Sequence, residues 1–442
     1  MTAILDKIFK LNERGTNIRT EAIAGTTTFM TMAYIIFVQP AVLSAVGMDF
    51  GAVMTGTCLA SAIAILLMGF IANYPIALAP AMGENFFFAF TIVMTMKFSW
   101  QAALAIVLVE GLLFLLITSF KIREMIIDAI PHSLKIGMAI GIGLFIAFIG
   151  LKWAGIVVHN PATGVSLGNI RSAPVIVAIA GVFITVAYIA RKLKGALLWG
   201  LLSTAVIGLA AGVIKYQGIV NMPPSITPVF AEFDFSQFLS ANFIAAVIIL
   251  LYMQLFDTIG TIIGVGETGG FLKEGRLPGV GRVLFVDALS ASIGAVFGTS
   301  PVSAYIESNT GVHEGGRTGL SNVFTALLFL IALFFSPIVQ MIGGGYKMAD
   351  GTYLYPVAAP ALITVGFFML KSVQKLDFSN LTETLPAYLT MVAIPLTYSI
   401  SDGIAVGMVS YPVVKILAGK FREVSPLMYA LAVLFILRYV LF

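Results

Sequence analysis

The chain alternates long apolar runs with short polar connections from end to end. A helix needs about 20 residues to cross the roughly 30 Å hydrocarbon layer of a membrane, and about fourteen runs approach or exceed that length. They cover residues 22–46, 51–72, 77–96, 101–119, 132–151, 173–190, 196–214, 241–264, 281–298, 303–315, 319–342, 354–373, 381–418 and 424–441. The thirteenth run is expected to break at Ser401-Asp402-Gly403. The pattern predicts an all-α polytopic membrane protein without a soluble domain.

Two runs differ from ordinary spans. Residues 73–88 and 298–312 each carry Pro and Gly at membrane depth, together with a carboxylate and an Asn. Backbone groups freed by such breaks must be satisfied by protein, water or ligand. Pro80 and Pro301 are 221 positions apart, half of the 442 residues. Interrupted spans at matching positions of two halves, with seven spans in each half, predict an inverted-repeat transporter whose binding site lies between the repeats.

Composition narrows the class of protein further. Hydrophobic residues make up 59% and charged residues 10% of the chain, and the mean hydropathy is +1.01. These values exclude a cytosolic enzyme, a disordered scaffold and a nucleic-acid binder. The chain has a single cysteine, Cys58, and therefore no disulfide framework. It contains neither a phosphate-binding GxxxxGK[ST] loop nor metal-ligand spacing of His and Cys, so we expect no ATP-driven step, no metal and no cofactor beyond a coupling ion.

Basic residues predict the orientation, because cytoplasmic connections retain Lys and Arg. Those that fall on the N-terminal side of the membrane are Lys7, Lys10, Arg14, Arg19, Lys121, Arg123, Arg191, Lys192, Lys194, Lys273, Arg276 and Arg282. The N-terminus is therefore expected in the cytoplasm, and the connection 217–240, without Lys or Arg, outside. Lys415, Lys420 and Arg422 do not fit if every later run crosses fully. Either 381–418 is a hairpin of two half-helices, or the last helix lies along the interface.

The eighth run carries a polar stripe. Gln254, Asp257, Thr261, Gly264 and Thr268 are spaced by three and four residues, which places them on one helix face. An ionisable group at membrane depth is costly, so it should face a cavity and bind substrate or a proton. The alternative is that Asp257 only joins helices by hydrogen bonds. We favour the functional reading, because intramembrane carboxylates usually mark ion or substrate pathways.

The second broken segment contains Glu307, which is predicted in the first turn of a half-helix. Unpaired N–H groups at that position stabilise negative charge. Ser308 and Asn309 follow it and would complete a polar pocket. The alternative is a capping cluster that only begins the helix, but the coincidence of a carboxylate with a broken span favours a binding site.

The first broken segment places Gly83, Glu84 and Asn85 at the corresponding position. Phe86 follows, and its ring is a candidate for stacking on a planar heterocycle. Aromatic rings are also ordinary filler in membrane helices, and for the ring alone that reading is the stronger one. Glu84 would pair with a cation, titrate or face an aqueous vestibule.

The first span has a weaker stripe of Thr27, Thr31 and Tyr34. Such residues are common at helix–helix contacts in membranes, so a packing role and a site role are evenly balanced. Glu110, in the fourth span, is also at membrane depth, and no role can be assigned to it from the sequence.

These motifs together resemble the nucleobase/cation symporter 2 superfamily, and within it the AzgA-like permeases for adenine, guanine and hypoxanthine. The resemblance runs nearly from end to end. It is strongest at 20–40 (TEAIAGTTTFMTMAYIIFVQP), 79–85 (APAMGEN), 130–135 (IPHSLK), 141–147 (GIGLFIA), 256–260 (FDTIG), 303–311 (SAYIESNTG) and 315–319 (GGRTG).

The resemblance implies fourteen spans in seven-plus-seven inverted repeats, with short strands in the broken spans 3 and 10. A core domain would comprise residues 1–120 and 241–342, and a gate domain residues 121–215 and 343–442. Homodimers are usual in the family. Asp257 and Glu307 match its eighth-span and tenth-span carboxylates and would both bind substrate and couple protons.

The expected function is import of a purine nucleobase across the plasma membrane, the bacterial inner membrane, by proton symport with alternating access; sodium is the other coupling ion considered. The candidate substrate-binding residues are Asp257, Glu307, Gly83, Glu84, Asn85, Phe86, Thr27, Tyr34, Thr261, Ser308 and Asn309. Family members commonly read APGMGLNA where this chain has Ala81, Glu84 and Phe86. Uracil, xanthine or a small anion is therefore kept as an alternative cargo. A channel and an intramembrane enzyme are less favoured, the latter because no nucleophile and base are paired.

Overall fold

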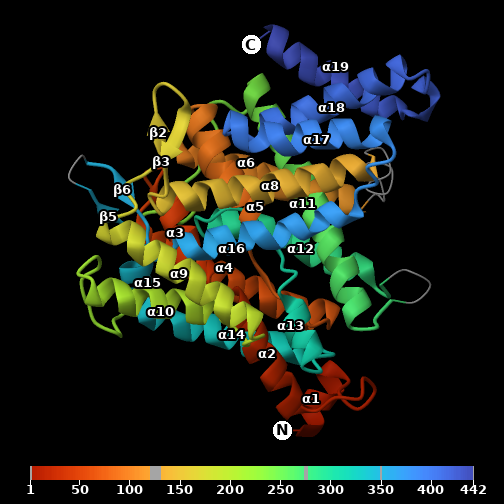
Figure 1. The fold of residues 1–442 in the computed structure, drawn as a ribbon. Helices are drawn as coiled ribbons and strands as arrows, with labels where there is room; N and C mark the ends of the chain where they lie inside the picture. Colours follow the sequence, from red (N-terminus) through yellow and green to blue (C-terminus); the bar gives the residue numbers. More distant parts are fainter. Residues whose placement is uncertain (1, 120–130, 273–276, 349–350, 442) are drawn as a thin grey trace. The chain divides into compact units, whose positions relative to one another are not determined.

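The computed structural model describes residues 2–119, 131–272, 277–348 and 351–441. The expected boundary at 120/121 and the basic residues Lys121, Arg123, Lys273 and Arg276 lie outside the described residues. The described chain is mainly helical (Figure 1). Its contacts divide it into two units, the first made of Met1–Ser119 and Trp153–Ala361 and the second of the described parts of Phe120–Lys152 and Leu362–Phe442.

The first unit contains most of the elements. Its helices are α1 Thr2–Phe9, α2 Ile18–Met32, α3 Ile35–Ser44, α4 Phe50–Leu67, α5 Met82–Phe86, α6 Trp100–Ser119, α9 Ala173–Ala190, α10 Ala196–Ala210, α11 Ala241–Thr268, α12 Val280–Val296, α13 Ser308–His313, α14 Leu320–Ala332 and α15 Ser336–Gly343. Two π-helical segments, η1 Met68–Ala72 and η2 Phe87–Thr95, and a 3₁₀ segment, η3 Leu333–Phe335, extend them. Its strands are β1 Leu78–Pro80, β2 Val157–Asn160, β3 Gly164–Leu167, β4 Val302–Ala304, β5 Tyr346–Lys347 and β6 Tyr353–Leu354.

The second unit is helical throughout its described part. It holds α8 His132–Trp153, most of α16 Ala359–Leu370, the 3₁₀ segment η4 Lys371–Lys375, α17 Leu381–Thr397, α18 Ile400–Leu417, the 3₁₀ segment η5 Phe421–Glu423, and α19 Pro426–Leu441.

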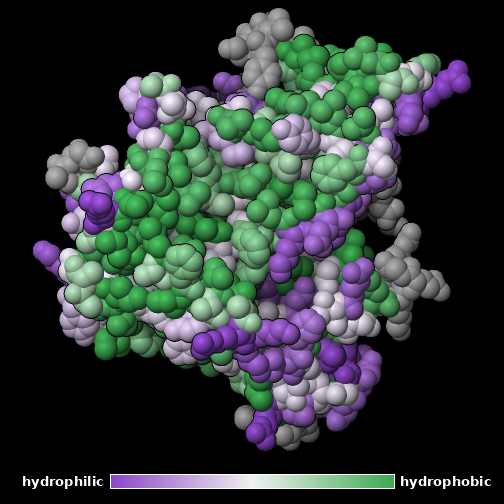
Figure 2. All heavy atoms as spheres, viewed as in Figure 1, coloured by the Kyte–Doolittle hydropathy of each residue, from purple (hydrophilic) through white to green (hydrophobic). Residues whose placement is uncertain are grey.

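Within the described ranges, eight helices are long and apolar enough to cross a membrane. They are Ile18–Ser44, Phe50–Ala72, Trp100–Thr118, His132–Trp153, Ala173–Ala190, Ala241–Thr268, Leu320–Gly343 and Ile400–Leu417. Seven of them match single runs predicted from the sequence, and Ile400–Leu417 covers only the second part of the run 381–418. Figure 2 shows hydrophobic residues spread over α9 and α10, where Phe183 is 70% and Val206 66% exposed. Such a surface suits contact with lipid, and the prediction of a polytopic membrane protein is confirmed at this level.

The two broken spans meet as a pair of strands. β1 and β4 are antiparallel, with Leu78 opposite Ala304 and Pro80 opposite Val302. The pairing extends beyond the strands, since Ala81 N donates to Pro301 O at 3.0 Å and Tyr305 N to Ala77 O at 2.9 Å. Because the strands are antiparallel, the short helices that follow them, α5 and α13, leave the pair from opposite ends. The prediction of short strands in these two spans is confirmed.

A buried carboxylate secures the start of α14. Glu21 of α2 is 0% exposed, and its oxygens accept from the backbone N–H groups of Arg317 at 2.8 Å, Thr318 at 3.4 Å and Ser321 at 3.1 Å. These groups have no partner within the helix, and a negative charge is favourable beside them. Glu21 therefore holds α2 against the segment that follows α13.

The thirteenth run forms two helices, α17 and α18, that pack against each other. Its break lies at Tyr398 and Ser399, so the expected break at 401–403 is wrong. Tyr398 ends α17 in the left-handed region (φ +56°), and Ser399 begins α18 by accepting from Asp402 N at 3.2 Å. Ser401-Asp402-Gly403 resembles a turn in sequence, but Gly403 is needed for packing. A Cβ at Gly403 would lie 2.7 Å from Ile394 N of α17.

A buried lysine holds this pair of helices together. Lys415 is 1% exposed, and its Nζ lies 2.7 Å from Glu383 Oε1 and 2.7 Å from Glu423 Oε2. Ser133 of α8 also donates to Glu383, at 2.6 Å. The hydrogen bond from Lys415 lowers the pKa of Glu423. Lys415 of α18 is therefore tied to α17 and η5, and Glu383 is in turn tied to α8.

Replacing Lys415 by Met should destabilise the second unit. Two carboxylates would then face each other without a cation, and the melting temperature of the detergent-purified protein should fall by roughly 3–6 °C. The measurement is thermal unfolding followed by circular dichroism. Lys375→Met, at an exposed lysine of the same unit, is the matched control and should change little. Equal melting temperatures for the two variants would show that the lysine is not needed for stability.

Candidate functional site

Helix α11 presents the predicted carboxylate on an open face. α11 packs against α5, α6, β4 and α13, whereas Asp257 and Gly260 are exposed. A Cβ at Gly260 would have no atom within 4 Å, so there is room beside Asp257. Gln254 and Thr261 are buried. The predicted stripe is therefore not uniform: Asp257 is exposed, whereas Gln254 and Thr261 are buried inside the unit.

Glu307 lies at the start of α13, as predicted. It is the residue directly before the helix, it is partly buried, and it accepts a hydrogen bond from Tyr34 Oη at 2.8 Å. One turn away, the hydroxyls of Thr31 and Thr310 are 2.8 Å apart. Thr27, one turn earlier in α2, is 6% exposed. The first-span stripe thus runs along α13, and its contact with Glu307 was not predicted.

Asp257, Glu307 and Glu84 belong to one region. Asp257 lies within electrostatic range of Glu84, Asp287 and Glu307. Glu84 is 2% exposed in the first turn of α5, and Gly83 before it is partly exposed. Asp257 of α11 therefore interacts with a carboxylate from each of the two broken spans.

Asn85 joins a buried amide network. It is 0% exposed, and its Nδ2 donates to Gln39 Oε1 at 2.8 Å. Gln39 Nε2 donates in turn to Thr299 Oγ1 at 2.9 Å and Ser300 Oγ at 2.8 Å. Asn85 Oδ1 has no hydrogen-bond partner among the described residues. The network links the first span to Thr299 and Ser300, which precede β4.

Three other predicted site residues differ in what they can offer a ligand. Phe86 is 0% exposed and stacks on Phe90, with ring centroids 5.8 Å apart and planes 8° from parallel. Ser308 is buried and accepts from Ala77 N at 2.9 Å, a bond that fixes α13 to β1. Asn309 is partly buried, and its Oδ1 has no partner among the described residues. Of the three, only Asn309 has a side-chain acceptor to which no described residue donates a hydrogen bond.

The sequence reasoning missed Asp287. This carboxylate of α12 is 0% exposed and accepts from Thr258 Oγ1 at 2.5 Å, Ala304 N at 2.8 Å and Ser303 Oγ at 3.3 Å. It therefore holds α11, α12 and β4 in register beside the site. The signal was available, because Asp287 is the one acidic residue in the 17-residue helix Val280–Val296.

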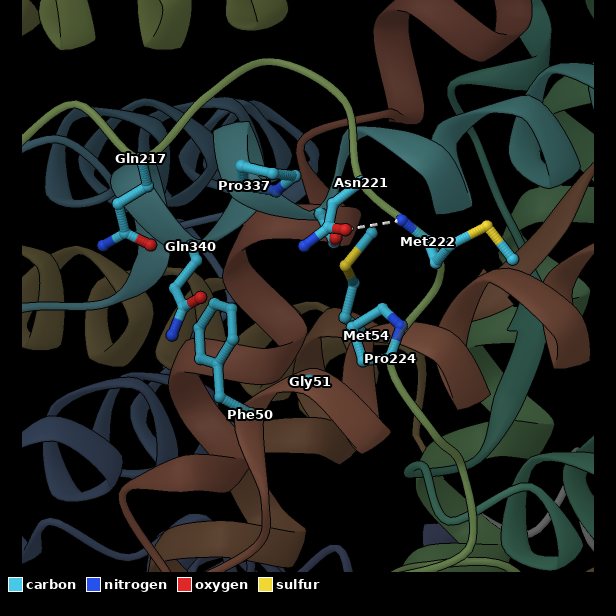
Figure 3. Close-up of a pocket in the computed structure, with 10 residues that line it drawn as sticks. Phe50, Gly51, Met54, Gln217, Asn221, Met222, Pro224, Pro337 and Gln340 are labelled. Carbon is cyan, nitrogen blue, oxygen red and sulfur yellow. Dashed lines mark hydrogen bonds between the residues drawn. The ribbon is translucent and has the colours of Figure 1, made fainter.

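A separate cavity of about 300 Å³ lies away from these carboxylates (Figure 3). Its lining comprises Phe50, Gly51, Met54, Gln217, Asn221, Met222, Pro224, Ser336, Pro337 and Gln340. Figure 3 shows the side chains of Gln217, Gln340 and Asn221 around it, with Asn221 Oδ1 accepting from Met222 N at 2.8 Å. None of its ten lining residues is ionisable. Four of these residues belong to the connection 217–240 expected outside the membrane and the others to α4 and α15, so we do not assign the transport site to it.

Comparison with known proteins agrees with this architecture. A family model described as "Permease family" matches residues 19–406. Adenine permease AdeP of Escherichia coli (strain K12) is 43% identical over 438 residues, which cover 99% of this chain and 96% of AdeP. Guanine/hypoxanthine permease PbuG of Bacillus subtilis (strain 168) is 42% identical over 444 residues, which cover 98% of each chain.

Solved structures agree on the fold. The transmembrane domain of a cyanobacterium bicarbonate transporter, BicA, superposes with a TM-score of 0.65 over 87% of this chain and 96% of that domain, at 13% identity. SLC26A9 superposes with a TM-score of 0.60 over 91% of this chain and 66% of its own, at 12% identity. At such identities the likeness concerns the fold alone. Because the family model and the full-length relatives cover nearly the whole sequence, this chain belongs to the permease family, a family of membrane transport proteins.

Proposed function

We propose that this permease imports a purine nucleobase across the plasma membrane by proton symport. The names of the full-length relatives AdeP and PbuG, which specify adenine and guanine/hypoxanthine, support this cargo. The observation that carries the proposal is the electrostatic interaction of Asp257 with Glu307 and Glu84, which follow the paired strands β4 and β1. Purines carry N–H groups along their edges, and carboxylates are strong acceptors for them.

In this mechanism, Asp257 and Glu307 accept hydrogen bonds from the cargo. Tyr34 orients the Glu307 carboxylate by donating to Oε1, and Gly83, with no side chain, lets the base approach the backbone of the first break. Asn309, whose Oδ1 is unpartnered among the described residues, is the remaining polar group for the base edge. Phe86 and Ser308 support the site by packing, and Thr27 and Thr261 line its buried wall.

The opposite departure of α5 and α13 from the strand pair supports the finer architecture that we propose. This is a fourteen-span protein of two inverted seven-span repeats, with core segments 1–120 and 241–342 and gate segments 121–215 and 343–442. The core would move as a body against the gate, exposing the site to each side in turn. A homodimer with a cytoplasmic N-terminus completes the proposal.

A small anion is the alternative cargo raised by the fold, since one structural relative is named a bicarbonate transporter. Anion sites at helix breaks use basic residues or bare helix N-termini. Here each break carries a glutamate instead, Glu84 and Glu307. A negative cargo would be repelled at both positions, so the neutral purine is favoured.

Uptake by a permease-deficient bacterium tests the proposal. Cells that express the protein should take up radiolabelled hypoxanthine, guanine or adenine saturably and in preference to uracil and xanthine. A protonophore should abolish accumulation without removing the protein from the membrane, whereas replacing sodium should have no effect. Absence of purine uptake, or accumulation that depends on sodium and resists the protonophore, would contradict the cargo or the coupling ion respectively.

A further inference from the structure

A buried carboxylate stands outside the site described above. Glu110 lies in the middle of α6 and is 0% exposed. It is the one ionisable residue in the 20-residue helix Trp100–Ser119. An isolated carboxylate in such surroundings is costly unless it is paired or protonated. The question is therefore what compensates this charge.

The partner of Glu110 is an amide, not a cation. With its amide nitrogen turned toward α6, Gln254 of α11 donates to Glu110 Oε2 at 3.1 Å and to Oε1 at 3.0 Å. Gln254 is itself 0% exposed. One side chain thus meets both oxygens of the carboxylate.

This pairing is suited to both protonation states. A carboxylate is an acceptor only and matches the two donors of the amide nitrogen. A carboxylic acid has one O–H donor, which matches the amide oxygen if the Gln254 amide turns by half a rotation. A lysine or arginine partner would instead keep Glu110 charged.

Within the described part of the chain, the charged groups that act on Glu110 are further acids. α6 packs against α11, α12 and η2. The ionisable groups that face Glu110 are Glu84 of α5 and Asp287 of α12, and η2 has none. Asp287 is satisfied by Thr258, Ser303 and Ala304. Among the described residues no basic side chain faces Glu110, so a bound proton is the means of removing its charge.

The backbone beside Glu110 is tightly packed. A Cβ at Gly111, the next residue, would lie 2.8 Å from Ser292 N of α12. Ser292 is 7% exposed, and its hydroxyl has no partner among the described residues. This contact holds α6 close to α12 beside Glu110.

Gln254 connects this pair to the cargo site. It precedes Asp257 by three residues on α11, so the two side chains are neighbours on the helix surface. Asp257 is exposed on the open face, whereas Glu110 is not. Glu84 and Asp287 lie within electrostatic range of both Glu110 and Asp257, so the two carboxylates are linked through these shared neighbours.

We propose that the Glu110–Gln254 pair is a second proton-binding site, separate from the carboxylates that meet the cargo. The proposal rests on the proposed function, because it assigns the pair to the coupling of proton and purine movement. Glu110 takes up one proton from water when the site is open outside and releases the same proton when the site is open inside. No other bond forms or breaks.

The first test is independent of any cargo. Infrared difference spectra between acidic and alkaline buffer should be recorded on the purified protein in liposomes. The wild type should show the C=O stretch of a buried protonated carboxylic acid, and Glu110→Gln should lack that band. Glu267→Gln, the same change at an exposed carboxylate of α11, should retain it. Identical spectra for the wild type and Glu110→Gln would overturn the proposal.

Gln254→Leu provides a second variant. It keeps the carboxyl group but removes its partner, so the band should persist at a shifted frequency because the hydrogen bond is lost. This shift in frequency tests the proposal even if Glu110→Gln fails to fold. An unchanged frequency would show that the amide does not bind the protonated acid.

A transport assay can distinguish a loss of proton coupling from a loss of cargo binding. A one-unit pH gradient sustains roughly tenfold accumulation of a neutral cargo that moves with one proton. Glu110→Gln should exchange labelled for unlabelled purine across the liposome but accumulate none above equilibrium. Accumulation equal to that of the wild type would refute the coupling role. If the wild type moves no purine, the proposed function fails, while the infrared result still decides whether Glu110 binds a proton.

Discussion

Changing Glu307 to Gln or Asp257 to Asn should reduce saturable purine uptake to near background at normal membrane expression. Each change keeps the shape of the side chain and removes its charge. A hydrogen bond to a charged group contributes about 1.5–3 kcal/mol, which corresponds to roughly 10- to 150-fold in affinity for each bond lost. Initial uptake rates over a range of purine concentrations measure the effect.

Two further variants make this result specific. Glu314, directly after α13, forms an ion pair with Lys194 outside the candidate site. Glu314→Gln removes this ion pair and should transport normally. Tyr34→Phe removes only the hydrogen bond that orients Glu307, so it should raise the concentration for half-maximal uptake without abolishing transport. Normal uptake by both Glu307→Gln and Asp257→Asn would show that the cargo binds elsewhere in the protein.

The second large effect concerns folding: Gly319→Leu should strongly destabilise the first unit. A Cβ at Gly319 would lie 2.6 Å from both Gly69 C and Gly69 Cα and would clash with the Gly69 carbonyl oxygen. These are backbone atoms, so the strain cannot be relieved by turning a side chain. Gly319 N also donates to Asn73 Oδ1 at 2.8 Å, which holds the contact in place. The expected loss is about 3 kcal/mol or more, or roughly 5–10 °C in melting temperature.

Gly281→Leu is the matched control for this experiment. Gly281 lies in α12, and a Cβ there would have no atom within 4 Å. The same side chain should therefore be accommodated with little change in the yield of purified protein or in its thermal unfolding. Equal stability of the two variants would mean that the contact between Gly69 and Gly319 can open at little cost.

Much of the candidate site could be predicted from the sequence, because each signal was local. A carboxylate in an apolar run is costly wherever the run packs, which singled out Asp257 and Glu307. Pro and Gly at membrane depth break a helix whatever its neighbours are, which identified both strand-bearing spans. The same rule applied to Asp287 would have found it as well.

The break in the thirteenth run shows the limit of local reasoning. Ser401-Asp402-Gly403 has the composition of a turn, yet these residues belong to α18. The close approach of Ile394 to Gly403 is a tertiary requirement. It uses glycine for the absence of a side chain rather than for a turn.

The sequence by itself determined the class of protein, the positions of most helices and the two interruptions, because hydrophobicity and backbone satisfaction are properties of a segment in a membrane. Only the tertiary structure decided which polar groups meet. Tyr34 and Glu307 are 273 positions apart, and Gln39 and Thr299 are 260 apart. Glu110 of α6 pairs with Gln254 of the neighbouring helix α11. These pairs depend on the rotation and depth of each helix against its neighbours, which are set by close contacts of small residues and cannot be read from the hydrophobic pattern of either helix alone.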